Sequence, residues 1–120
     1  MAITAVKDYE VNIAAGESAS NALSLEDGHR LFAVLLQTDF TEANLAPQFT
    51  LDDGANWHFL SKRGEHVKIT GVANEVCLVD NPVDMAVFPS YRFLSVSKTD
   101  DTTPVNQVAA QKIELICRTI

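Results

Sequence analysis

Four carboxylates in the first half of the chain have the types and spacing best suited to chemistry: Asp39, Glu42, Asp52 and Asp53. Paired carboxylates on either side of a sugar carry out glycoside hydrolysis. Nothing near these residues marks a cleft, and the sequence has no GxSxG, phosphate-cradling glycine loop or nucleotide fingerprint. We therefore expect solvated acidic loops and a protein that is not an enzyme. A small glycan-active or metal-dependent enzyme is the weakest alternative.

Metal-binding chemistry has few candidates. The run Asp52–Gly54 resembles the start of a calcium loop, but the remaining ligands and the closing Glu are missing. Cys77 and Cys117 each lie inside an apolar run, which favours buried reduced thiols over a disulfide. The histidines lie on or beside turns without zinc-like spacing: His29, His58 and His66. We expect no metal and no cofactor.

Aromatic residues raise the alternative of sugar binding, because carbohydrate-binding sandwiches often present exposed rings. Trp57 and Phe59 are two residues apart, as are Tyr91 and Phe93. Each pair therefore shares one face of a strand, as core residues do. We expect core positions, with Trp57 at the centre.

The balance of charge bears on possible partners. The chain has 120 residues, enough for one domain, with 16 acidic and nine scattered basic residues and a net charge of -7. A phosphate backbone would be repelled, so we expect no nucleic-acid partner. The N-terminus lacks the pattern of a signal peptide, and no segment reaches membrane-spanning length, so we expect no membrane partner and assembly inside a cell.

The elements that would position these residues are strands. Tyr9, Val11 and Ile13 alternate with polar residues, and the segment 112–117 does the same. Two apolar runs within 48–60 are joined by Asp53-Gly54, which predicts a hairpin. Between the first and last strands, the expected strands are 20–25, 31–37, the two hairpin strands 47–51 and 57–60, and then 66–70, 75–79 and 91–97. About eight short strands indicate an all-β fold, an antiparallel β-sandwich or barrel.

Two of these strands break the alternation. The runs 31–36 and 76–79 are apolar on both faces, whereas a sheet with one wet face should alternate. A loop, the terminal arm or closure into a barrel would cover the second face from within. The alternative is another subunit, contacted through Phe32, Val34 and Leu36.

The segments 39–45, the hairpin, 91–97 and 103–107 before the last strand together resemble small β-rich structural proteins of tailed bacteriophages. In particular they resemble capsid decoration or cement proteins. The resemblance covers about residues 20–118 and is one of order and style, without an invariant motif. It implies a jelly-roll-like β-sandwich, a dimer or trimer, that binds the major capsid protein on the outer surface of the virion. A tail or fibre component with a carbohydrate-binding sandwich is the alternative.

The expected organisation is an N-terminal arm, 1–8, followed by a single β-sandwich domain, 9–120. Through Ile3 and Val6 the arm would add to the edge of a partner's sheet, or it is a frayed terminus. Three cationic side chains are the expected contacts to an acidic neighbour: Lys62, Arg63 and Arg92.

Overall fold

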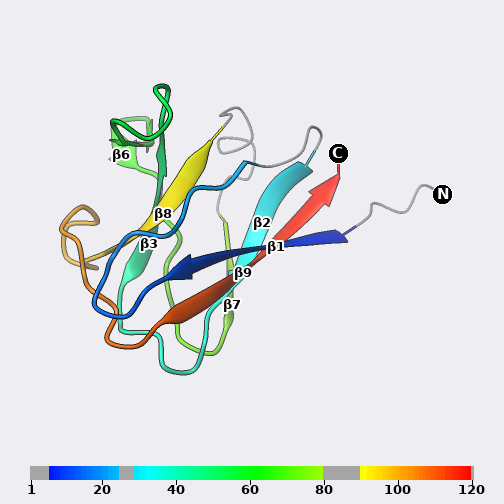
Figure 1. Ribbon diagram of the computed structural model, residues 1–120, viewed down its shortest axis with the longest axis vertical. Coiled ribbons are helices and arrows are strands. Elements are labelled where there is room, and N and C mark those ends of the chain that lie inside the picture. Colours follow the sequence, from blue (N-terminus) through cyan, green and yellow to red (C-terminus); the bar gives the residue numbers. More distant parts are fainter. Residues whose placement is uncertain (1–5, 25–28, 80–89, 120) are drawn as a thin grey trace.

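The computed structural model describes residues 6–24, 29–79 and 90–119, shown in colour in Figure 1. Within these ranges there is no helix, and every strand pairing is antiparallel, so the expected all-β antiparallel class is confirmed. The described strands are β1 (Val6–Ile13), β2 (His29–Leu35), β3 (Asn44–Phe49), β4 (His58–Phe59), β5 (Ser61–Lys62), β6 (Glu65–His66), β7 (Val76–Leu78), β8 (Tyr91–Val96) and β9 (Gln111–Thr119).

The strands form two larger sheets and one hairpin. The four-stranded sheet has the order β1-β9-β2-β7, and the three-stranded sheet has the order β4-β3-β8. Figure 1 shows β9 between β1 and β2, with β8 and β3 forming the other sheet. The remaining two strands, β5 and β6, pair only with each other. Because β9 is the last strand and lies between β1 and β2, the sheet closes only when the C-terminal segment is in place.

One large apolar core draws on both larger sheets. From the four-stranded sheet it takes alternate residues of β1 and β9, and from the three-stranded sheet it takes Leu45, Tyr91 and Phe93. The rings of Tyr91 and Phe93 meet edge to face, with centroids 5.8 Å apart. Cys77 and Cys117 are buried free thiols, as expected. The alternation read along the first and last strands is therefore confirmed as one buried face and one outer face.

The expected hairpin is present, with a longer loop than a tight turn. Gln48 pairs with Phe59 across β3 and β4, and Asp53 and Gly54 have the positive φ angles, 56° and 87°, expected of an Asp-Gly turn. The loop is organised by the Asp52 carboxylate. It accepts hydrogen bonds from the Asn56 side chain at 2.7 Å and backbone at 2.9 Å, which with the Thr50 hydroxyl lower the pKa of Asp52 to about 2.

The prediction that Trp57 lies at the centre of the core is wrong. Trp57 is half-buried and belongs to neither apolar cluster, and Phe59 packs at the border of a second, small cluster. The reason is the length of the loop, because β4 begins only at His58 and leaves Trp57 ahead of the sheet. The guanidinium carbon of Arg92 lies 4.5 Å from the centroid of its ring.

Two expected strands are present only as short pairings. The segment 20–25 forms no strand in its described part, but bridges at Ala19 and Leu23 place the 18–23 stretch along the free edge of β8. Of the segment 66–70, only His66 belongs to a strand, and Ile69 forms a bridge with Leu45. Each segment is held by a few backbone hydrogen bonds, such as Ser20 N–H to the Phe93 carbonyl at 2.8 Å. Both therefore act as irregular borders of the three-stranded sheet.

The first strand begins earlier than the expected boundary between arm and domain. Val6 pairs with Arg118, so residues 6–8, assigned to the arm, continue β1 along β9. Ile3 lies outside the described residues. The backbone at Val6 is therefore engaged with this chain's own sheet.

Candidate functional site

A β-bulge decides which apolar side chains of β2 face the core. Leu31 pairs with Cys117 and Ala33 with Ile116, so the register shifts by one residue between them. As a result Leu31 and Val34, three apart, both face the core, and Leu36 follows them. Val34 and Leu36, expected as partner contacts, are therefore buried within this chain, while Phe32 at the bulge is half-buried. The inserted residue reverses the alternation, so that after the bulge the even-numbered residues of this segment face the core.

The second doubly apolar strand, β7, keeps strict alternation. Cys77 and Val79 point into the core, whereas Val76 and Leu78 point outward and are 53% and 73% exposed. The outward side chains of β7 continue an apolar surface across β2 to β9, because Val76 pairs with Leu35 and Leu78 with Ala33. We call this surface the outer apolar face; its members are Ala33, Leu35, Val76, Leu78 and Ile116. The exposed part of the face thus lies on β7, whereas the expected partner contacts lie in and beside β2.

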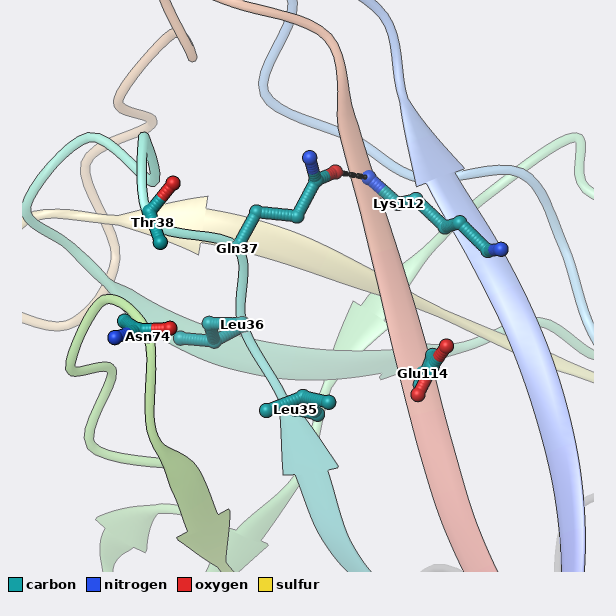
Figure 2. A pocket seen from close by; sticks show the side chains of 7 residues that line it. All are labelled: Leu35, Leu36, Gln37, Thr38, Asn74, Lys112 and Glu114. Atoms are coloured by element: carbon teal, nitrogen blue, oxygen red, sulfur yellow. Dashed lines mark hydrogen bonds between the residues drawn. The ribbon is translucent and has the colours of Figure 1, made fainter.

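A shallow groove lies at one end of the outer apolar face (Figure 2). Its lining mixes apolar, amide and charged side chains: Leu35, Leu36, Gln37, Thr38, Asn74, Lys112 and Glu114. The Gln37 side-chain oxygen accepts a hydrogen bond from the backbone N–H of Lys112, and the Asn74 N–H donates to the Gln37 carbonyl at 3.1 Å. The groove therefore gives the apolar face a polar border.

The charged amine of the groove is paired with a residue of β1. The Lys112 amine extends toward β1 and contacts the Glu10 carboxylate at 3.1 Å (Figure 2). That hydrogen bond is the main cause that lowers the pKa of Glu10, and it also raises the pKa of Lys112. Both shifts stabilise the charged forms, so the amine stays a cation rather than becoming a base.

Three of the four acidic candidates are engaged in separate local interactions, and the fourth, Asp53, is exposed in the loop between β3 and β4. Asp39 accepts a hydrogen bond from the Gln111 amide at 3.1 Å, and Glu42 lies 3.8 Å from the amine of Lys98. Asp52 is held within its own loop. Among the residues that the structure describes, no group of three or more His, Cys, Asp or Glu side chains could hold a metal ion.

The cationic candidates lie on different elements. Lys62 and Arg63 are exposed in the β5–β6 hairpin, while Arg92 lies half-buried in β8. Arg92 is fixed by two contacts, because its Nε donates to the Gln48 side-chain oxygen at 2.9 Å and its guanidinium stacks on Trp57. Burial lowers the pKa of Arg92. The structure therefore pre-orients Arg92 but does not join it with the other two cations.

Comparison of the chain with protein-family models, curated proteins and solved structures finds no match. In the described part of the chain, no helix is long and apolar enough to span a membrane. The outer apolar face and its polar border are the surface features that bear on function.

Proposed function

We propose that this protein is a non-enzymatic structural protein of a virion, which binds the major capsid protein and stabilises a phage head from outside. The observation that carries the proposal is the pair Val76 and Leu78, two large apolar side chains exposed side by side on one strand. Contiguous exposed apolar surface marks association sites. The two larger sheets around one core support a sandwich, which we propose to be jelly-roll-like.

The mechanism we propose is multivalent. The outer apolar face supplies the dry centre of the contact, and the groove beside it, with Gln37, Asn74 and Lys112, supplies a hydrogen-bonding rim. Each contact is small, so a single copy binds weakly. Many copies on one head, present as dimers or trimers, together hold neighbouring capsid proteins.

The Leu78→Lys variant tests this proposal. We expect the wild-type protein to co-sediment in a fixed ratio with heads of the parent phage that lack it. Because a lysine would place a charge at the water-free centre of the contact, we expect the affinity for heads to fall at least tenfold, about 1.4 kcal/mol or more. Val108→Lys is the matched control, since Val108 is 83% exposed and not part of the outer apolar face. Failure of the wild-type protein to sediment with heads would overturn the proposal.

A carbohydrate-binding tail or fibre component is the second candidate, and the half-exposed Trp57 is the observation in its favour. Against it, Arg92 lies over the ring that a sugar would need for stacking. We therefore expect the fluorescence of Trp57, the single tryptophan, to be unchanged when host surface glycans are added. The Arg92→Ala variant, which uncovers the ring, serves as the comparison. A saturable change in wild-type emission would favour sugar binding.

A further inference from the structure

The free edges of the two larger sheets differ in how they are protected. The edge of β8 is covered by the 18–23 segment, and β3 is bordered at Leu45 by Ile69. At the β1 edge, the Asn12 N–H donates to the Asn21 side chain, and the strand carries the charged, exposed Glu10. Covering segments and charged residues are the usual means of preventing edge-to-edge pairing.

The edge at β7 has neither kind of protection in the described part of the chain. Its three residues, Val76–Leu78, carry no charge, and β7 is the last strand in the order of its sheet. No described segment forms a strand or bridge on its outer side. An apolar, unpaired edge of this kind is a template for a further strand.

The hydrogen bonds to β2 show which backbone groups of β7 point outward. The Val79 N–H donates to the Phe32 carbonyl at 2.9 Å, and the Leu36 N–H donates to the Glu75 carbonyl at 3.2 Å. Cys77, between them, pairs with Val34. In an antiparallel pair the residues that bond a neighbour alternate with those that bond the opposite side. The N–H and C=O groups of the two residues beside Cys77 therefore point away from β2.

We propose that two copies of this chain join through antiparallel pairing of their β7 strands about a two-fold axis at Cys77. In this register Val76 of each copy lies opposite Leu78 of the other copy. The outward N–H and C=O groups of both residues can then form hydrogen bonds across the two-fold axis. A two-fold axis requires a self-complementary patch, and β7 provides one because its outward groups lie symmetrically on either side of Cys77.

The side chains and charges agree with a second copy as the occupant. Cross-strand neighbours share a face, so the apolar rows Leu35–Val76 and Ala33–Leu78 of the two copies would join into one continuous stripe. Glu75, the nearest acid in sequence, would lie opposite an apolar Val79. Two chains of net charge -7 would thus pair without an acidic residue directly opposite another acidic residue along the segment 75–79.

The pairing goes beyond the proposed function and does not depend on it. The dimer uses the backbone edge of β7, while the outer apolar face remains turned outward and is doubled in length. It can therefore be tested without phage heads. If the protein does not dimerise in this way, a single copy could still bind the phage head.

Two double variants with the same loss of apolar surface test the register. In V76K/L78K, each cross-strand pair becomes Lys opposite Lys, which is repulsive; in V76E/L78K, each becomes Glu opposite Lys, which is attractive. Light scattering over a concentration series should show the wild-type mass rising to twice that of the chain. V76K/L78K should remain at the monomer mass, and V76E/L78K should again reach the dimer mass at low salt and lose it at high salt.

Circular dichroism checks that the variants fold, and since both positions are exposed we expect unchanged spectra. A wild-type protein that stays monomeric throughout, or that forms a trimer, overturns the inference. So does a V76K/L78K protein that still dimerises, because the contact then lies elsewhere. If V76E/L78K stays monomeric like V76K/L78K, the proposed register is wrong.

Discussion

Replacing Gly71 by alanine is expected to destabilise the protein by about 3 kcal/mol, because the added methyl group has no space. Its carbon would lie 2.2 Å from the carbonyl oxygen of Ala43 and 3.2 Å from the ring of Phe40. The first neighbour is a backbone atom of the residue just before β3, and it cannot turn away as a side chain would. The melting temperature should fall by roughly 12 °C.

Gly64→Ala is the matched control. Gly64 has a φ of 81° with nothing within 4 Å of an added methyl group, so only the left-handed backbone opposes the substitution. That conformation costs about 1 kcal/mol. Thermal and urea unfolding of both variants measure the difference. Equal losses of stability would contradict the close approach at Gly71.

The position of Gly71 connects this packing to the candidate function. Its N–H donates to the Asn44 side chain at 3.2 Å, and Asn44 in turn donates to Asp101 at 2.8 Å. This contact fixes the chain just before β7, whose edge and outward side chains carry both proposals. We therefore expect Gly71→Ala also to weaken self-association at temperatures where the variant is still folded.

Gln107→Leu is expected to cost about 3 kcal/mol of stability, although leucine has a similar size. The Gln107 amide is fully buried and accepts from the Thr41 N–H at 2.7 Å, while its nitrogen donates to the Ser95 hydroxyl at 2.8 Å and the Thr41 carbonyl at 3.2 Å. Leucine would leave these groups without partners, and each buried unpaired group costs about 1–3 kcal/mol. Urea unfolding measures the loss.

Gln111→Leu provides the comparison, because Gln111 is equally buried but differently engaged. Its nitrogen donates to acceptors of Asp39 and Ala109, and its side-chain oxygen has no partner. Removing an unpaired oxygen offsets part of the loss, so we expect about 1 kcal/mol. If Gln107→Leu lowered the free energy of unfolding no more than Gln111→Leu, the hydrogen bonds that join Gln107 to Thr41 and Ser95 would not matter for stability.

Much of the fold could be predicted from local patterns. Alternation in β1 and β9, the Asp53-Gly54 turn and the buried thiols were read correctly, since each depends on residues near one another in sequence. The candidate site was only partly predicted. The two doubly apolar runs were recognised, but partner contacts were assigned to Val34 in β2 and to Leu36 just after it, and the structure buries both.

The sequence by itself determined the all-β class, because period-two alternation needs no knowledge of which strands pair. Only the tertiary structure decided which apolar side chains remain exposed. The bulge beside Leu31 and the position of β7 at the end of its sheet follow from pairings between distant segments. Trp57 lies ahead of β4 because the loop between β3 and β4 is longer than a tight turn. Register and sheet order are set by such long-range contacts, so a run apolar on both faces shows that something must cover it but not which strand stays uncovered.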